Sequence, residues 1–285
     1  MQSNTLPQRI WFLWFQGKAN MPEIVEMCFE SWLRHNPTWE VVFLDDTNLE
    51  KYIGFRSELN LNRDDIPLQA QSDIIRINLL QKFGGVWVDS TCYCNQPLDN
   101  WLTDKLSSGF FAFNRPNTDR MMSSWFLAAF PNNDLVKSYC DATNAFWQIN
   151  PPEKVLKKRD KKNLIELVSM TFLASYPAFW HKLIVKKRLS FSHYFWFHYL
   201  FEHLYKTDKT FYSIWDETPK FSANIPHKLM HFGFNSKAST DIRNEIKTPT
   251  APFFKLNWRI TTNQEADSTL NILITQDKLK RDRQN

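Results

Sequence analysis

Glycine is scarce in this chain, with six residues among 285. Phosphate-binding loops of the P-loop and dinucleotide types need several glycines at fixed spacing, so that the backbone can approach the phosphates closely. Neither G-x-G-x-x-G nor G-x-x-x-x-G-K-[ST] occurs in the sequence. The single glycine pair, Gly84-Gly85, therefore marks one special turn and no glycine-rich nucleotide loop.

Cysteine is also sparse, and the four residues are Cys28, Cys92, Cys94 and Cys140. Cys92 and Cys94 are too close together for the usual spacing of a cysteine pair that binds zinc, and no second pair follows them. We therefore expect reduced thiols and a cytoplasmic setting.

Long apolar runs are missing as well. No stretch of about 18 or more uncharged apolar residues occurs, so no transmembrane helix is expected. The N-terminus lacks a charged start followed by an apolar core, so no signal peptide is expected either.

Aromatic residues are abundant, at 15% of the chain, with 24 Phe and 12 Trp. Such a composition suits stacking platforms for sugars or bases, or a surface that touches a membrane. The formal charge is +5, and basic residues cluster in Lys154–Lys162, His181–Arg188 and Lys278–Arg283. These clusters are either solvated charge runs or contacts for an anionic partner such as lipid head groups, phosphate or nucleic acid.

The first half of the chain alternates strand and helix signals. In order, we expect a strand at Gln8–Phe15, a helix from Pro22 to about Asn36, a strand at Trp39–Asp45, a short helix at Leu49–Ile53, a helix at Leu68–Phe83 and a strand at Val86–Val88. This order predicts an α/β fold with a parallel, Rossmann-type nucleotide-binding sheet.

The second half gives weaker signals. We expect a strand at Gly109–Pro116, a small-residue turn from Ser123, a helix from about Asp134, helical and basic structure through 151–207 with an aromatic helix at Leu189–Tyr205, and strand-like segments at Pro226–Phe234 and Ala251–Arg259. His193, His198 and His203 recur every five residues, which spreads them around a helix. We therefore interpret them as packing or surface histidines.

Two charges lie on an apolar helix. At about 100° per residue, Asp73 and Arg76 fall among Leu and Ile side chains and not on an opposite polar face. One interpretation is a structural ion pair between residues three apart, and the other is a ligand site. Asp89 follows the next strand, at the sheet edge where ligands bind in open α/β folds, and this favours the ligand site.

Three segments occur in an order that resembles a known family. They are LPQRIWFLWFQG (Leu6–Gly17), SWLRHNPTWEVVFLDD (Ser31–Asp46) and SDIIRINLLQKFGGVWVDST (Ser72–Thr91). The set resembles bacterial capsular polysaccharide synthesis glycosyltransferases, is similar to glycosyltransferase family 32, and is more distantly similar to the large clostridial glucosylating toxins. The resemblance is strong over 6–115, weaker over 116–205, and returns near FFKLNWR.

The resemblance implies a GT-A-like fold, a UDP-linked nucleotide-sugar donor and transfer with retention of anomeric configuration. It implies that Trp14, with Trp11 from the same segment, belongs to the donor-binding residues and that Trp14 stacks on the nucleobase. Asp73 and Arg76 would hold the donor sugar and brace the diphosphate. Asp89 would be the first residue of a D-x-D motif that binds ribose and a divalent metal, Mn²⁺ or Mg²⁺.

Thr91, which the resemblance also places among the donor-binding residues, departs from that motif, because it stands where a second Asp would be. Hard divalent ions favour carboxylate oxygens, so the departure puts metal dependence in question. Lys255 or Arg259 would assist the diphosphate if the C-terminal segment folds over the donor. A front-side attack by the acceptor hydroxyl is expected, because no carboxylate nucleophile is evident.

We expect one domain over 1–285, with a donor-binding half at 6–115, an aromatic-rich helical acceptor or membrane-facing region at 116–210, and a C-terminal segment at 211–285 returning to the sheet. The expected acceptor is a bacterial surface polysaccharide or a lipid-linked oligosaccharide at the inner face of the plasma membrane. The alternatives are a sugar-phosphate transferase of cell-envelope assembly and a non-catalytic membrane- or nucleic-acid-binding module. No nucleic-acid partner is expected, because the basic clusters lie in helical or tail segments.

Overall fold

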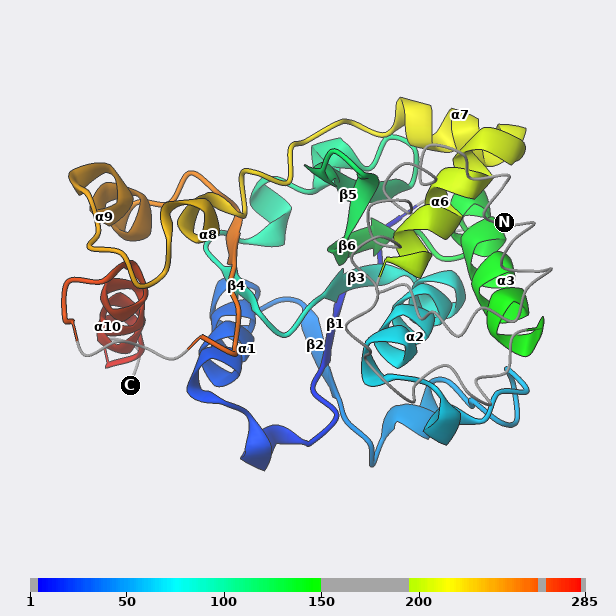
Figure 1. Cartoon of the computed structure of the whole chain (residues 1–285), viewed down its shortest axis with the longest axis horizontal. Coiled ribbons are helices and arrows are strands. Elements are labelled where there is room, and N and C mark those ends of the chain that lie inside the picture. The colour runs from blue at the N-terminus through cyan, green and yellow to red at the C-terminus, as the bar shows by residue number, and fades with distance from the viewer. Residues whose placement is uncertain (1–4, 150–194, 261–264, 283–285) are drawn as a thin grey trace, which may run out of the picture.

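A five-stranded mixed sheet with the order β2-β1-β3-β6-β5 forms the centre of the molecule (Figure 1). The computed structural model describes residues 5–149, 195–260 and 265–282. β1 (Arg9–Leu13) pairs in parallel with both β2 (Glu40–Leu44) and β3 (Gly85–Val88). β6 (Arg120–Ala129) is antiparallel both to β3 and to β5 (Phe110–Asn117). The predicted α/β class and the parallel first half are confirmed.

The sheet separates two apolar cores, because successive side chains of a strand point to opposite faces. In β1, Ile10 and Phe12 join the core that contains α1 (Glu23–His35). Trp11 joins the core that contains α2 (Leu68–Phe83). The architecture is therefore helix, sheet, helix, as the predicted order of elements requires.

The remaining helices flank this centre. They are α3 (Asp134–Ile149), α6 (Trp196–Thr207), α7 (Lys209–Glu217), α8 (Lys228–Phe232), α9 (Thr240–Lys247) and α10 (Thr269–Asp282). Short 3₁₀ helices lie at Lys18–Asn20, Leu49–Lys51, Arg63–Asp65, Leu98–Asn100 and Thr103–Lys105. α3, α6 and α7 pack on the α2 side, whereas α8, α9 and α10 lie at the opposite end, next to α1 (Figure 1). None of the helices in the described ranges has the length and apolar character needed to cross a membrane.

The turn into β3 depends on its glycine pair. Gly84 has φ of 64° and Gly85 has φ of 92°, which are conformations that other residues rarely adopt. A Cβ on Gly85 would also lie 2.6 Å from the carbonyl oxygen of Arg9 in β1. The pair therefore ends α2 and lets β3 approach β1 closely.

The C-terminal segment returns to the first half through a second sheet. β7 (Phe253–Lys255) pairs antiparallel with β4 (Cys92–Cys94), outside the five-stranded sheet. The register places Lys255 opposite Cys92, just beyond the end of β3. The expected strand near FFKLNWR is present, although it does not extend the central sheet.

Two expectations for the second half are wrong. The segment from Ser123 is not a turn but part of β6, which is buried between β3 and β5, so its small side chains lie in a packed layer. The segment Pro226–Phe234 is not strand-like, because its centre forms α8. The aromatic helix begins at Trp196, and the expectations for 151–194 lie outside the described residues.

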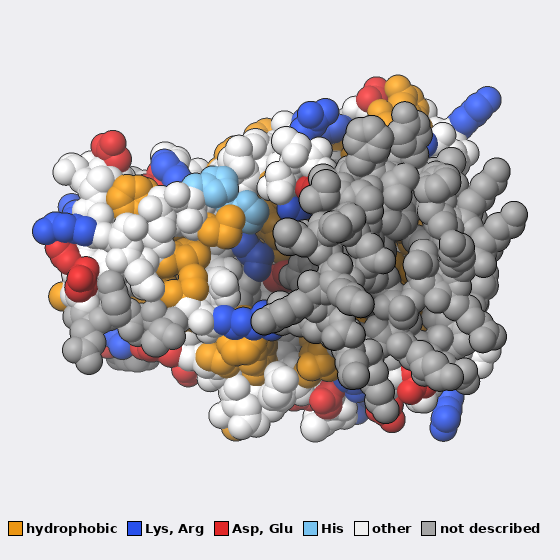
Figure 2. All heavy atoms as spheres, viewed as in Figure 1, with side chains coloured by type: hydrophobic (Ala, Val, Ile, Leu, Met, Phe, Trp, Pro, Cys, Tyr) orange, Lys and Arg blue, Asp and Glu red, His pale blue; other side chains and the backbone are white. Residues whose placement is uncertain are grey.

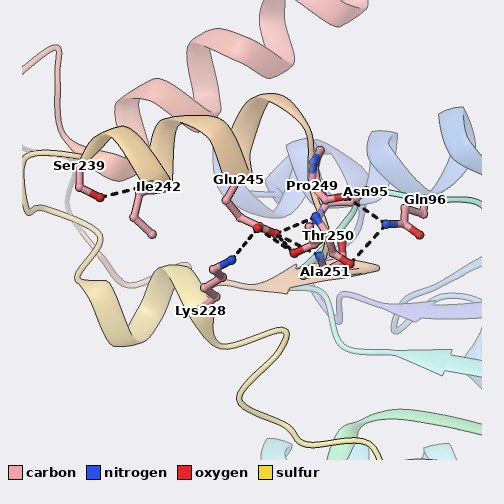
Figure 3. A network of polar contacts seen from close by, with 9 residues as sticks. All are labelled: Asn95, Gln96, Lys228, Ser239, Ile242, Glu245, Pro249, Thr250 and Ala251. Atoms are coloured by element: carbon pink, nitrogen blue, oxygen red, sulfur yellow. Dashed lines mark hydrogen bonds and ion pairs between the residues drawn. The ribbon is translucent and has the colours of Figure 1, made fainter.

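A buried carboxylate fixes the approach to β7 (Figure 3). Glu245 in α9 is 5% exposed and accepts hydrogen bonds from the backbone N–H groups of Thr250 and Ala251 at 2.9 and 3.0 Å. It also accepts from Lys228 Nζ in α8 at 2.6 Å. Asn95 then donates to the carbonyl of Ala251 at 3.1 Å, which ties this loop to the first half.

Replacing Glu245 is expected to loosen this end of the molecule. Glu245→Ala leaves the buried N–H of Ala251 and the partly buried N–H of Thr250 without an acceptor, so we expect a loss of about 2–4 kcal/mol in the free energy of unfolding. The measurement is urea unfolding at pH 7, with Asp141→Ala as the control. Asp141 pairs with Lys137 in an exposed ion pair, which should contribute little to the free energy of unfolding.

The Glu245 contribution also has a predicted pH dependence. Burial would raise its pKa, but Lys228, Ala251 and Thr250 outweigh it and hold the pKa below 4.5. A lowered folded pKa means that the stabilisation is present above pH 4.5 and is lost as pH falls through the folded value. The stability difference between wild type and Glu245→Ala should therefore shrink on acidification; a constant difference from pH 7 to pH 3 would contradict this account.

Candidate active site

Asp89 lies at the carboxyl edge of the parallel strands. It follows Val88, the last residue of β3, and its backbone N–H donates to the carbonyl of Trp125 in β6 at 2.9 Å. Strand alternation places Asp89 on the same face as Trp87, whose indole Nε1 donates to Asp89 Oδ1 at 3.0 Å. The side chain keeps 27% of its surface exposed, so it remains accessible to a ligand.

Arg76 stands directly behind Asp89 and is 5% exposed. Its guanidinium donates to the carbonyl of Ser124 in β6 at 2.8 Å, and to the hydroxyl and carbonyl of Ser72 at 2.9 and 3.2 Å. Arg76 NH2 lies 3.3 Å from Asp89 Oδ1. Arg76 therefore connects α2 to β6 and forms an ion pair with Asp89 on the side of the carboxylate that faces the core.

Asp73 shares the same guanidinium. Its Oδ1 lies 3.1 Å from Arg76 NH1, which is the pairing of residues three apart that the sequence suggested. Burial raises the pKa of Asp73 to about 7, although Arg76 opposes the rise, and Asp89 adds to it. Burial would also raise the pKa of Asp89, but Arg76, Lys255 and Trp87 together hold it below its usual value. Arg76 lowers the pKa of both carboxyl groups, and the additional contacts with Lys255 and Trp87 favour the ionised form of Asp89 over that of Asp73.

Lys255 reaches Asp89 from the C-terminal segment. Its Nζ lies 3.7 Å from Asp89 Oδ2 and donates to the hydroxyl of Thr91. Thr91 is 6% exposed, and its carbonyl accepts from the backbone N–H of Leu256 at 2.7 Å. Asp89, Thr91 and Lys255, all three predicted as donor-binding residues, therefore form one contact group.

A pocket of about 730 Å³ opens beside Asp89 and Lys255. Arg115 and Arg120 from the β5–β6 hairpin also line it, as do residues Ser123 to Trp125. Its other lining residues include His198, His227 and His231. Figure 2 shows histidine side chains at the surface beside α8, with Lys or Arg side chains close to them. Among the lining residues three cationic side chains outnumber the one carboxylate, so the pocket favours an anionic ligand.

Two of the pocket histidines are neutral at pH 7. Burial, with a further contribution from Arg120 and Arg76, lowers the pKa of His198 to about 3. Burial and the neighbouring Lys255 lower the pKa of His227 to about 4. Neither Nδ1 atom has a hydrogen-bond partner among the described residues. His198 is therefore buried, as the packing interpretation expected, but it also lines the pocket.

The predicted aromatic residues separate into two groups. Trp14 is half-buried just beyond β1, with its ring 5.5 Å from that of Trp258, and the guanidinium of Arg259 lies 5.1 Å from the Trp258 ring. Trp11 has no exposed surface, and its indole donates to the carbonyl of Gly84 at 2.9 Å. The expectation that Trp11 binds a ligand is wrong, because strand alternation turns it into the core.

The residues present do not fit the expected divalent metal at Asp89. Asp89 is already contacted by Arg76, Trp87 and Lys255, and Thr91 offers a neutral hydroxyl that faces the Lys255 ammonium. Across the described ranges no group of three or more His, Cys, Asp or Glu side chains is placed to hold a metal ion. Mg²⁺ and Mn²⁺ need several oxygen ligands, so this donor set is poor.

Several site residues were missed at the level of sequence. Trp87, Arg120, His227 and Trp258 each stand close to a predicted residue, but periodicity alone marks them as core or surface. Trp258 is the one with a signal, because it lies between Lys255 and Arg259 in the C-terminal segment that carries the resemblance.

Comparison with known proteins gives a family match over most of the chain. The family described as "Capsular polysaccharide synthesis protein" matches residues 1–153 and 161–273. A curated relative, the protein named O-glycosyltransferase braB from Annulohypoxylon truncatum, is 27% identical over 162 residues. That match covers 50% of this chain and 38% of the relative, so the chain spans about two fifths of the relative's length.

Two solved glycosyltransferase structures show a weak likeness. One, titled PaToxG Glycosyltransferase, is 13% identical, with a TM-score of 0.37, and the match covers 73% of this chain and 86% of the other. The other is the UDP-bound glycosyltransferase domain from the YGT toxin, 10% identical, with a TM-score of 0.42 and coverage of 97% and 98%. These scores are too low to support an argument, and the fold rests on the strands described above.

The shared guanidinium leads to a prediction for Asp73. A folded pKa of about 7, raised from 3.8, means that its contribution to stability is fully present below pH 3.8 and is lost as pH rises through 7. The side chain of Asp73→Asn stays neutral at every pH. The unfolding free energy of the variant minus that of the wild type should therefore rise by about 1–4 kcal/mol between pH 4 and pH 8. Urea unfolding at several pH values measures the difference, and a difference that does not change with pH would refute the shift.

Proposed function

Because the chain belongs to the capsular polysaccharide synthesis protein family, we propose that it is a glycosyltransferase that uses a nucleotide-sugar donor. One observation carries the proposal: Asp89, at the carboxyl edge of the parallel strands, opens with Lys255 into a cationic pocket of about 730 Å³. That edge is where open α/β sheets bind nucleotides, and the charge suits a diphosphate. The name of the Annulohypoxylon truncatum relative, an O-glycosyltransferase, supports transfer to a hydroxyl oxygen.

The proposed donor is UDP-linked and lies along this edge in a GT-A-like manner. Its diphosphate would lie against Lys255, while the Trp14 and Trp258 rings, which meet edge to face, offer a surface for the base. Asp89 would hold ribose or sugar hydroxyls through its exposed oxygen. Arg76 and Asp73 do not line the pocket, so in this arrangement they act by positioning Asp89.

The proposed reaction is a front-side transfer with retention. The bond between the anomeric carbon and the phosphate oxygen breaks, and its electron pair stays with the diphosphate. The acceptor oxygen forms the new bond to the same face of the sugar, and its proton passes to the departing phosphate oxygen. Cations fixed at the site stabilise the charge that develops on the leaving group, without reorganisation during the reaction.

The acceptor has a candidate entrance. A second pocket, of about 530 Å³, shares Arg115, Thr118 and Arg120 with the first and is lined by Glu202 and Trp215 among others. Carboxylates beside aromatic rings suit sugar hydroxyls and sugar faces. A growing bacterial surface polysaccharide or lipid-linked oligosaccharide is the proposed acceptor. Lipid-linked acceptors would place the enzyme at the inner face of the plasma membrane.

A sugar-phosphate transferase is the second candidate, favoured by the same cationic pocket. The two activities differ in product mass by one phosphate, so mass spectrometry of the product separates them. The donor itself is found with a thermal-shift panel of nucleotide-sugars. A specific donor at 100 to 1,000 times its Kd stabilises by about 2.7–4.1 kcal/mol.

Asp89 provides the direct test of the site. Asp89→Asn keeps the shape but removes the charge, so transfer should fall by about a hundredfold or more, equivalent to ~3 kcal/mol. The measurement is the rate of nucleoside diphosphate release with the donor found in the panel. Asp99→Asn is the matched control, because Asp99 also accepts from an indole, that of Trp39 at 3.0 Å, and does not line the pocket. Near-normal transfer by Asp89→Asn would remove Asp89 from the active site.

A further inference from the structure

The space between Asp89 and Thr91 holds a protein cation. Lys255 Nζ donates to the Thr91 hydroxyl and lies 3.7 Å from Asp89 Oδ2. In a D-x-D motif, two side chains at this spacing would bind a divalent ion. We propose that the Lys255 ammonium replaces that ion, so that this chain binds and neutralises the donor diphosphate without a metal. The inference rests on the proposed function and deepens it.

Backbone contacts on both sides of β7 fix the position of Lys255. Antiparallel pairing of β4 with β7 sets Lys255 opposite Cys92. The N–H of Lys255 donates to the carbonyl of Pro226 at 2.8 Å, and the next N–H, of Leu256, donates to Thr91 at 2.7 Å. The side chain is 16% exposed and lines the pocket. An ammonium anchored in this way is available before the donor arrives, as electrostatic preorganisation requires.

The charges already present disfavour a divalent ion in the same place. Asp89 Oδ1 receives the Trp87 indole at 3.0 Å and lies 3.3 Å from Arg76, and Asp89 Oδ2 faces Lys255. A metal ion would share one carboxylate with two fixed cations and would find a neutral hydroxyl in place of the second carboxylate. Like charges at such short range repel strongly in a partly buried site.

Lysine also has suitable chemistry for the task. Its ammonium is a compact point charge with three donors and is a common ligand for phosphate groups. Two pocket arginines, Arg115 and Arg120, supply further positive charge for an anionic ligand. The negative charge left on the diphosphate when the sugar departs is therefore matched by side chains of this chain.

The first experiment uses the wild-type protein. Isothermal titration with UDP, and then with ADP, GDP and dTDP, is carried out in EDTA and again in Mn²⁺. We expect at least one nucleotide to bind with affinities that agree within twofold in the two conditions. Binding that weakens tenfold or more in EDTA would overturn the inference while leaving the proposed function intact. If no nucleotide binds in either condition, the inference and the proposed donor both fail.

Variants then assign the effect to Lys255. Lys255→Ala should weaken UDP binding at least tenfold in EDTA, about 1.4 kcal/mol, while uridine, measured by ligand-observed NMR, binds as it does to wild type. Lys237→Ala is the matched control, because Lys237 is an exposed lysine paired with Asp267 away from the pocket. Unchanged UDP binding by folded Lys255→Ala would overturn the inference. If this variant does not fold, the wild-type comparison with and without EDTA decides.

Discussion

The site depends on one buried guanidinium. Arg76 contacts Ser72 in its own helix, Ser124 in β6 and the carboxylate of Asp89 after β3, so three elements meet on a single side chain. A cation this deeply buried is tolerated only when its donors are satisfied and its charge is balanced. Asp73 and Asp89 supply the balancing charge, and the pKa of Asp89 is held below its usual value in return. The geometry of the pocket edge therefore follows from a requirement of the core.

The parallel half of the fold could be predicted from the sequence, whereas β6 could not. β1, β2 and β3 stand between clear helix signals, so their order alone gives the helix–sheet–helix layers. β6 is covered on both faces, and a strand buried on both faces loses the alternation that identifies strands. Its Ser-Ser-Trp-Phe-Leu-Ala-Ala run thus resembles a small-residue turn, although it is central to the sheet and carries the carbonyl that fixes Arg76.

The candidate site was predictable where its residues are local in sequence. One helix–strand unit carries Asp73, Arg76 and Asp89. The three-residue spacing along the helix and the position of Asp89 at the end of the strand are enough to predict that they lie close together. Lys255 is 164 residues away from Thr91, and their contact exists only because β7 pairs with β4. The prediction for Trp11 failed for a local reason. Trp11 lies within β1, where its side chain points into the core that contains α2, whereas Trp14 lies beyond the end of the strand.

The charge balance limits what Asp89 can do. Arg76 and Lys255 hold its pKa below the usual range, so near neutral pH it is an anion with little tendency to take a proton. The same contacts orient Lys255 toward the pocket, where positive charge outnumbers negative charge. A carboxylate in this setting suits binding and orientation better than proton transfer. In the proposed front-side transfer, the proton of the acceptor hydroxyl would therefore leave by another route, and the departing diphosphate oxygen, adjacent to the incoming hydroxyl, would accept it.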